Sequence, residues 1–503
     1  MAQDIFAQYI NNLQSINAAE EERAISDREI LMNIQSKLDS LSVPSANGFG
    51  GDSDISVIGG KIVLPDHGIL ESDLHIKDGK ILCIGKLNVN AKRTVNAQGK
   101  YVIPGIIDPH VHLGLFGDLK QELATETKSA VIGGVTSLGC YFGGQEPYIN
   151  KFSEINNAVE QNSYADIIPH LVIGNKTQRE QIYDYVHKLG VSSFKIYLNG
   201  IPGMISDVDD GFILDVMDEI KKSGKKCLIC AHAENRDIIK RSYNKVKEEL
   251  GDEAKIYDWT RTHPEIAEEE AVIRLSYLAE KCEVDVYFVH ISSQEAIQRL
   301  ERIKRKNPYV YVETTSPYLS IARDMHNFDL DRNLLKMEPP FRDSEDVEEL
   351  WRTVKNGTVD CIGTDNVTQT LSEKNSNDTL WNAMSGYPAL GTHLPVLLHE
   401  GVAVRGMSLE KLVLALTKRP AEVFGVYPRK GTLLPGSDAD IVLLDMNMEK
   451  QVHASDLMSR SDFSIYEGRT LKGWPVMTIK AGQIVAENGR YVGIHCTGIC
   501  LKR

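Results

Sequence analysis

The chain is poor in cysteine, with eight among 503 residues. This number is too low for a domain held together by disulfide bonds, and the chain is long enough to bury a large apolar core without them. Cys227 and Cys230 have the C-x-x-C spacing of some zinc and redox sites. They lie in the apolar run CLICAHAEN, which favours buried strand residues over either role. Cys496 and Cys500 have no neighbouring motif that indicates a metal site.

Basic residues are also in deficit, with 56 Lys and Arg against 70 Asp and Glu and a formal net charge of -14. This balance argues against nucleic acid or an anionic membrane surface as a general partner. No apolar run reaches the roughly 20 residues needed to span a bilayer. The first residues, MAQDIFAQYINN, lack the basic and apolar regions of a secretory signal. We therefore expect a soluble, cytoplasmic protein.

The first 50 residues differ from the rest of the chain. Leu31, Ile34, Leu38 and Leu41 recur at steps of three and four among charged neighbours, which predicts an amphipathic helix. A run rich in Ser, Asn and Gly follows and is typical of a linker. The helix either packs on its own domain or forms a contact between subunits, and the sequence leaves both possibilities open.

Two kinds of periodicity predict the architecture. Strand-like segments such as ISVIGGKIVL and VMTIKAGQIVAENGR occur near both ends, and together they predict one small β-sandwich domain from residues 51–103 and 427–495. Between them, at 104–426, short apolar strands such as VTSLGCYF, SSFKIYL and DVYFVHIS alternate with helical stretches. Repeated β–α units of this length predict an α/β fold with a (β/α)8 TIM barrel. Residues 496–503 are predicted to be a tail.

Candidate metal ligands stand at the ends of these strands. His110 and His112, in PGIIDPHVH, are two residues apart on a strand and therefore share a face from which both imidazoles can reach one ion. Taken singly, such residues are often core histidines, helix caps or surface lysines. Several ligand types at the catalytic face of one barrel instead predict a metal site. The other four are Lys195 in SSFKIYL, His232 in CAHAEN, His290 in FVHIS and Asp365 in GTD.

Lys195 is informative because a lysine inside a barrel would be a costly unpaired charge. Reaction of its neutral amine with CO2 would give a carbamate, an N6-carboxylysine, whose two oxygens can bridge two divalent ions. The modified lysine would then be an anionic metal ligand instead of an unpaired buried charge.

With these motifs, the chain resembles the cyclic amidohydrolases of the amidohydrolase superfamily, in particular hydantoinases and dihydropyrimidinases. The resemblance covers nearly all of residues 55–495. It includes, beyond the ligand motifs, the segments ATETKSAVIGGVTSL, HPEIAEEEAVIRLSYLAE, ETTSPYL, EPPFR, NAMSGYPALGTHLPVLL and KGTLLPGSDADIVLLD.

The resemblance implies a role for each ligand. His110 and His112 would bind the more buried of two divalent ions together with Asp365. His232 and His290 would bind the second, and carboxylated Lys195 would bridge both. Zinc is the expected metal, with manganese as the alternative. Asp365 would move the proton of the attacking water to the leaving ring nitrogen, so we expect a hydrolase of carbon–nitrogen bonds in cyclic amides (EC 3.5.2 type). Homotetramers are common in such families, and a dimer is the alternative.

Positions that would face the substrate depart from the family. The tyrosine five residues after the bridging lysine is Gly200 here, and Tyr197 either lines the site in its place or belongs to the core. Glu338 replaces the serine of the S-P-P-L-R motif, and Asn382 resembles the asparagine whose backbone holds the ring. Dihydroorotases have an arginine in H-x-H-x-R where this chain has Gly114.

Two alternatives therefore accompany a hydantoin or dihydropyrimidine substrate. The first is an allantoinase-like hydrolase or another cyclic ureide, imide or lactam substrate. The second is a non-catalytic assembly protein like the dihydropyrimidinase-related proteins. Such proteins lose metal ligands, whereas all six positions are present here. Asn366, which replaces the histidine usual after the catalytic aspartate, is a further departure.

Overall fold

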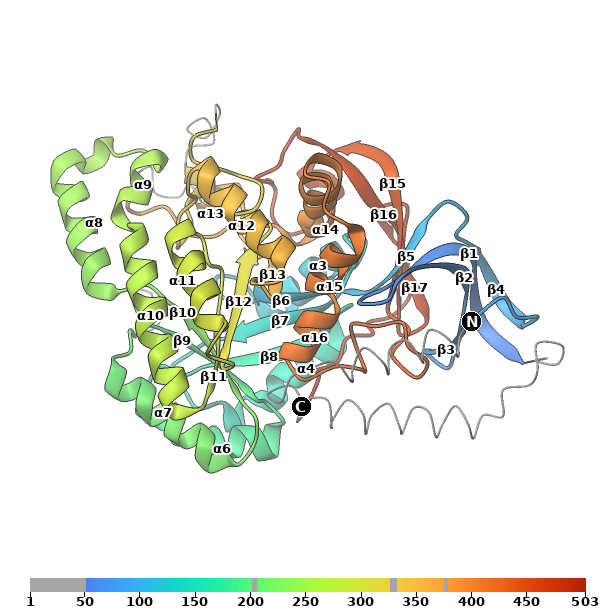
Figure 1. The fold of residues 1–503 in the computed structure, drawn as a ribbon, viewed down its shortest axis with the longest axis horizontal. Coiled ribbons are helices and arrows are strands. Elements are labelled where there is room, and N and C mark those ends of the chain that lie inside the picture. Colours follow the sequence, from blue (N-terminus) through green and yellow to red (C-terminus); the bar gives the residue numbers. More distant parts are fainter. Residues whose placement is uncertain (1–50, 201–205, 326–332, 375–378) are drawn as a thin grey trace.

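A closed parallel barrel forms the centre of the computed structural model, which describes residues 51–200, 206–325, 333–374 and 379–503 (Figure 1). Neighbouring barrel strands pair in sequence order. They are β6 (Ile106–His112), β7 (Val135–Phe142), β8 (Asp166–Val172), β9 (Ser193–Tyr197), β10 (Leu228–His232), β11 (Asp285–Phe288), β12 (Val310–Thr315) and β13 (Cys361–Gly363). The short strand β14 (Asn366–Val367) follows β13 and pairs in parallel with β6, which closes the ring. The predicted (β/α)8 barrel is therefore confirmed.

Helices surround this barrel (Figure 1). Side-chain oxygens cap the beginnings of several of them; the Asp118 carboxylate, for example, accepts a hydrogen bond from the Gln121 amide at 2.9 Å. The helices are α3 (Leu119–Ile132), α4 (Phe152–Asn162), α5 (Lys176–Arg179), α6 (Ile182–Asp184), α7 (Asp210–Ser223), α8 (Arg236–Leu250), α9 (Ile256–Thr262), α10 (Glu265–Cys282), α11 (Gln294–Lys304), α12 (Ser344–Asn356), α13 (Leu371–Lys374), α14 (His393–Leu397), α15 (Leu409–Leu416) and α16 (Lys418–Val423).

The barrel strands lack an alternating pattern because both of their faces are covered. Every residue of β7 and β8 is buried, which is typical of parallel strands between a packed interior and a helical layer. Cys230 in β10 and the adjacent Cys227 are buried among them, as the sequence indicated. Polar side chains in these strands therefore need partners inside the barrel.

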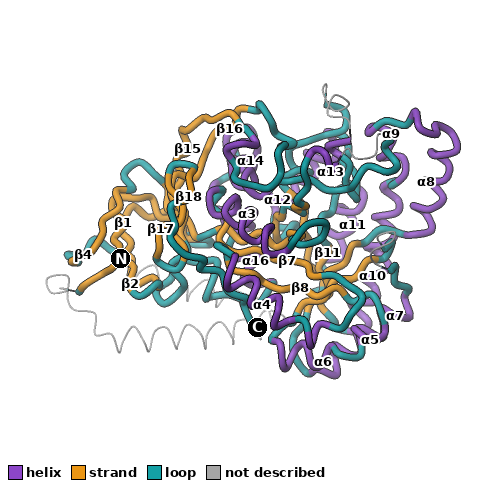
Figure 2. Tube along the Cα trace, turned by 180° about the vertical axis from the view of Figure 1, so that it is seen from behind, coloured by secondary structure: helices purple, strands orange, loops and turns teal. Residues whose placement is uncertain are grey.

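A second, mixed sheet stands beside the barrel (Figures 1 and 2). Strands from both ends of the chain meet in it, where β5 pairs antiparallel with β15, and the sheet packs on an apolar cluster of its own. This accords with the predicted small β domain. Its strands are β1 (Asp52–Leu64), β2 (Gly68–Lys77), β3 (Lys80–Ile84), β4 (Asn90–Asn96), β5 (Tyr101–Pro104), β15 (Ile441–Gln451), β16 (Thr470–Lys480), β17 (Gln483–Glu487) and β18 (Arg490–Tyr491).

The last residues of the chain pack against the beginning of the barrel strands. The Leu501 amide donates to the carbonyl of Ile167 in β8 at 2.8 Å. The buried guanidinium of Arg503 donates to the Pro169 carbonyl and to the Ser193 hydroxyl, both at 2.7 Å. The segment predicted to be a tail thus lies at the end of the barrel opposite the predicted metal ligands.

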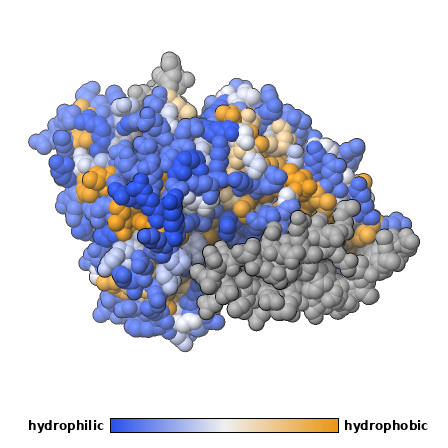
Figure 3. Space-filling view, in the orientation of Figure 1, coloured by the Kyte–Doolittle hydropathy of each residue, from blue (hydrophilic) through white to orange (hydrophobic). Residues whose placement is uncertain are grey.

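The face seen in Figure 3 is mostly hydrophilic, with separate hydrophobic patches. Within the described ranges, no helix has both the length and the apolarity to cross a membrane. The amphipathic helix predicted around residues 31–41 lies outside the described residues.

Candidate metal centre

Three of the predicted ligands meet where the barrel closes. His110 and His112 lie on β6, and Asp365 lies between β13 and β14. The Asp365 Oδ1 atom is 3.3 Å from His110 Nε2 and 3.1 Å from His112 Nε2. All three residues are buried, and their ligand atoms lie within 4.8 Å of one another. This cluster has the donor types and spacing that a divalent metal ion needs.

The other two histidines adjoin this cluster. His232 is the last residue of β10, and its ring centroid is 4.6 Å from that of His290, which follows β11. The His290 ring lies 5.4 Å from the His110 ring. Burial holds the pKa of both His110 and His290 well below the usual range, so both imidazoles are neutral, as metal ligands must be.

Lys195 lies in β9, fully buried beside the histidines. Its Nζ atom has no hydrogen-bond partner among the described residues and lies 4.7 Å from the ring centroid of Tyr141 and 4.9 Å from that of Tyr197. Burial lowers the pKa of Lys195 to about 8. The neutral amine is therefore accessible near neutral pH, and this is the form that can react with CO2.

Glu313, in the barrel strand β12, supports His110 and His290. One of its carboxylate oxygens is 2.8 Å from His110 Nδ1 and accepts the His290 amide at 3.0 Å. The other oxygen accepts the Tyr287 hydroxyl at 2.7 Å. Burial raises the pKa of Glu313 to about 8. Sequence reasoning missed this residue, although it belongs to the quoted ETTSPYL segment.

Glu234 supports His232 in the same way. Its fully buried carboxylate is 2.9 Å from His232 Nε2 and 3.1 Å from His263 Nδ1. Burial acts to raise the pKa of Glu234, but His263 and His232 hold it well below the usual range. The sequence could have indicated Glu234, because this acidic residue follows the predicted ligand His232 by two positions in HAEN.

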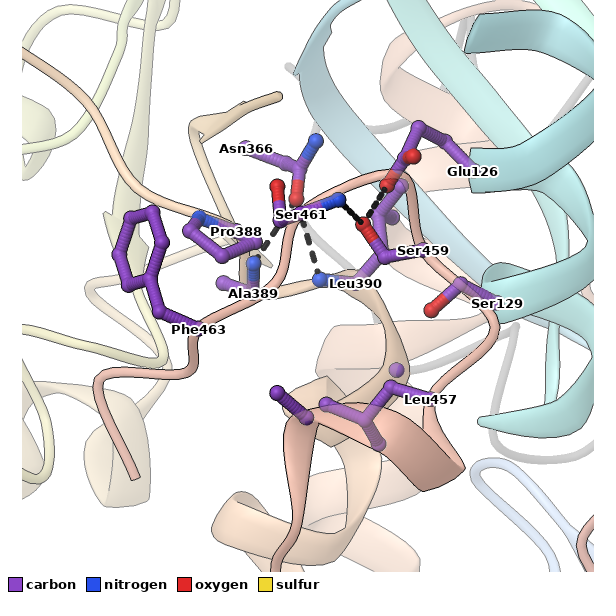
Figure 4. Close-up of a pocket in the computed structure, with 12 residues that line it drawn as sticks. Glu126, Ser129, Asn366, Pro388, Ala389, Leu390, Leu457, Ser459, Ser461 and Phe463 are labelled. Atoms are coloured by element: carbon purple, nitrogen blue, oxygen red, sulfur yellow. Dashed lines mark hydrogen bonds between the residues drawn. The ribbon is translucent and has the colours of Figure 1, made fainter. Parts of the chain in front are cut away.

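Asp108 fixes the loop that carries Asp365. Its carboxylate accepts the Thr364 hydroxyl at 2.6 Å and the Thr364 and His110 amides at 3.1 Å. Asn366, on the other side of Asp365, accepts the amides of Ala389 and Leu390 at 2.8 and 3.3 Å through its side-chain oxygen (Figure 4). Asp365 is therefore held from both neighbouring positions.

The three predicted substrate-binding residues lie in different environments. Tyr197 pairs in register with His232 and is buried, with the two ring centroids 5.6 Å apart. Glu338 is half-buried, and its carboxylate accepts the Ser385 hydroxyl at 2.9 Å. Asn382 is exposed. The structure thus brings Tyr197 to the ligand cluster.

Backbone geometry explains one departure from the related motifs. Gly114 has a φ of 72°, and a Cβ atom there would lie 2.9 Å from the Cβ atom of Leu119. An arginine at this position would need the first turn of α3 to move.

The remaining buried histidines have partners away from the cluster. Nδ1 of His75 is 2.7 Å from the Ser56 hydroxyl, that of His170 is 2.5 Å from the Ser193 hydroxyl, and that of His393 is 2.8 Å from the Ser316 hydroxyl. These contacts indicate structural roles for the three histidines.

Known proteins resemble this chain both in sequence and in structure. The sequence profile of the amidohydrolase family matches residues 101–485. An L-hydantoinase of Paenarthrobacter aurescens is 32% identical over 449 residues, covering 87% of this chain and 95% of that protein. A D-hydantoinase of Ralstonia pickettii is 32% identical over 462 residues, covering 90% and 99%. The solved structure of an L-hydantoinase (dihydropyrimidinase) from Arthrobacter aurescens aligns with a TM-score of 0.84 at 30% identity, covering 90% of this chain and all of that one.

Proposed function

Because this chain belongs to the amidohydrolase family, we propose that it opens a cyclic amide by hydrolysis. The observation that carries the proposal is the gathering of His110, His112 and Asp365 around one point. The names of its relatives support a hydantoin, a dihydropyrimidine or a related cyclic ureide as the substrate. A non-catalytic scaffold would not need these side chains together.

The residues present fit two divalent ions. His110, His112 and Asp365 would hold one, His232 and His290 the other, and Lys195 would bridge them. To become a bridge, the neutral Lys195 amine forms an N–C bond with CO2 and loses a proton, which leaves a carbamate. Its buried, unpartnered Nζ atom supports this modification. We expect zinc, with manganese as the alternative, because histidine and carboxylate donors accept both. When bound, such ions lower the pKa of a water molecule and polarise the carbonyl group under attack.

The side chains supply the proton transfers. Asp365 takes a proton from the attacking water as a C–O bond forms at the ring carbonyl, and it delivers a proton to the ring nitrogen as the C–N bond breaks. The product is a ring-opened acid. Glu313 and Glu234 keep His110 and His232 in one orientation during this step.

We further propose that the enzyme is a cytoplasmic homo-oligomer, either a tetramer or a dimer. Its β domain would be formed from residues 51–103 and 427–495 and its barrel from 104–426, with 1–50 as an N-terminal extension and linker and 496–503 as a tail. The strand pairing of β5 with β15 supports a β domain built from both ends of the chain.

The decisive experiment combines metal analysis with ring-opening assays on hydantoin, dihydrouracil, allantoin and simple lactams. We expect close to two divalent ions per chain and hydrolysis of at least one of the first two substrates. Hydrolysis of allantoin alone would instead favour the allantoinase-like alternative. A metal-free protein with an unmodified Lys195 would overturn the proposal.

A further inference from the structure

Within the described residues, two lysines outside the metal cluster are buried and donate their hydrogen bonds to backbone oxygens. The Nζ atom of Lys336 also lies over the Trp259 ring, 4.3 Å from its centroid. Lys336 is 3% exposed and Lys374 is 0% exposed. Each ammonium group donates hydrogen bonds to carbonyl oxygens, and within the described ranges no carboxylate forms a salt bridge with either. A buried ammonium group is costly unless its donors are satisfied, so these contacts define where each lysine is held.

Lys336 organises one turn of the chain. Its Nζ atom donates to the carbonyl oxygens of Leu380 at 2.9 Å, Trp381 at 3.3 Å and Ala383 at 2.7 Å. An ammonium group has three donors, and all three are used. The same turn is closed by the Ala383 amide, which donates to the Thr379 carbonyl at 3.1 Å. The Lys336 ammonium group thus binds three carbonyl oxygens that point toward it, as a basic side chain does at the C-terminus of a helix.

Lys374 fixes the residues that follow. Its Nζ atom donates to the Lys336 carbonyl at 3.0 Å and to the Gly386 carbonyl. The Gly386 amide donates back to the Lys336 carbonyl at 2.9 Å. Gly386 has a φ of 108°, and a Cβ atom there would lie 2.5 Å from that of Val367, so its backbone packs directly on β14. We call residues 379–387, which these two lysines hold, the clasped segment.

The clasped segment is joined to the residues that follow Asp365. The Val367 amide donates to the Tyr387 carbonyl at 3.0 Å, and Val367 is in register with His112. The Gln369 side-chain amide donates to the Ser385 carbonyl at 2.7 Å. The segment therefore lies at the catalytic face of the barrel, beside the strand end that carries Asp365.

From this arrangement, and resting on the proposed hydrolase function, we propose that Lys336 and Lys374 are positioning residues. They hold the clasped segment as one wall of the substrate pocket, and they determine how tightly the cyclic amide binds while leaving the metal ligands unaffected. Loss of either ammonium group would leave buried carbonyl oxygens without donors, and the segment would move toward water to satisfy them.

The test uses the metal-loaded, full-length protein and the variants Lys336→Met and Lys374→Met, which keep most of the side-chain volume but lack donors. The matched control is Lys480→Met. Lys480 is equally buried and donates to the Thr497 carbonyl at 2.8 Å, but its partner Asp166 begins β8 at the other end of the barrel. For each protein, metal content, amide hydrogen exchange, KM and kcat are measured.

We expect exchange at the amides of residues 379–387 to be about tenfold faster in both test variants, with other barrel amides unchanged. KM should rise about tenfold while kcat stays within about threefold and both ions stay bound. The control should lose thermal stability without a change in KM. If Lys336→Met does not fold, Lys336→Gln, which keeps two N–H donors, should give the same changes at smaller size.

Unchanged exchange at 379–387 in a folded, metal-loaded variant would overturn the positioning role. A KM shift of equal size in Lys480→Met would overturn it as well, because the effect would then be one of general stability. If the unmodified protein opens no ring, the proposed hydrolase function fails, and the pocket role fails with it. The exchange measurement would then still decide whether the lysines hold the segment.

Discussion

The Nδ1 atom of His110 lies 2.8 Å from a carboxylate oxygen of Glu313, and neither side chain is exposed to solvent. An imidazole that gives one nitrogen to a fixed carboxylate presents the other to a metal ion in one tautomer and one orientation. Here the other nitrogen, Nε2, faces Asp365 at 3.3 Å. Glu313 therefore acts through His110 on the centre where the barrel closes.

Glu313→Gln should weaken metal binding by about 10- to 100-fold, because an amide is a poorer partner for the His110 Nδ1–H group. Metal titration of the apo-protein would measure this change. Tyr287→Phe is the matched control, since it removes only the hydroxyl that donates to the other carboxylate oxygen at 2.7 Å. Equal metal affinity in Glu313→Gln and the unmodified protein would show that His110 is oriented by packing alone.

Lys195→Ala should bind fewer than two ions per chain and lose activity, because no carbamate can form without the amine. Elemental analysis would measure the metal content, and ring-opening assays would measure the activity. The intact mass of the protein without the substitution should include the carboxyl group on Lys195. Tyr141→Phe serves as a control, as it keeps the ring 4.7 Å from Nζ and leaves the lysine in place. A Lys195→Ala variant that keeps two ions and full activity would contradict the bridging role.

Tyr197→Phe should lower kcat/KM by about 10-fold or more if the hydroxyl contacts the substrate, as expected for loss of a hydrogen bond made in the transition state. The ring stays beside His232 in this variant, so metal content should not change. Steady-state kinetics with parallel metal analysis would measure it. Unchanged kinetics would assign Tyr197 to the core, the other interpretation that its sequence position allowed.

The fold was predictable because its signals are local. VTSLGCYF predicted a buried strand, and β7 consists of these residues. The ligands at strand ends could also be named, because parallel strands bring their carboxyl ends to one face. Partnerships across the chain could not be predicted in this way. Glu313 meets His110 across 203 positions, and no local pattern encodes that contact.

The same limit applies at the other end of the barrel. Arg503 reads as the last residue of a polar tail, yet its guanidinium is buried against Pro169 and Ser193. Burial lowers the pKa of Arg503 to about 10.

Lys430→Met should destabilise the fold without changing the metal centre. The buried Lys430 ammonium bridges Asp166 at 2.5 Å and Asp440 at 2.6 Å, where the β domain meets the barrel, and it also lies 2.9 Å from Asp438. Its loss leaves buried carboxylates without their cation, at a cost of about 3–5 kcal/mol. Urea denaturation at pH 7 would measure the loss, and activity per bound ion should be unchanged.

The loss of stability caused by Lys430→Met should also depend on pH, because the carboxylates that bind Lys430 do so only when they are ionised. Burial acts to raise the pKa of Asp438, but Lys430 and its other cationic neighbours hold it below the usual range. Stability from such a group is complete above its unfolded pKa of about 4 and is lost as pH falls toward the folded value. The difference in stability between the Lys430→Met variant and the protein without the substitution should therefore narrow below about pH 4.

Lys80→Met is the control for Lys430→Met. It removes a half-exposed cation from the same Asp438 and should cost no more than about 1 kcal/mol of stability. Equal losses in both variants would mean that burial of Lys430 contributes nothing beyond an ordinary surface ion pair.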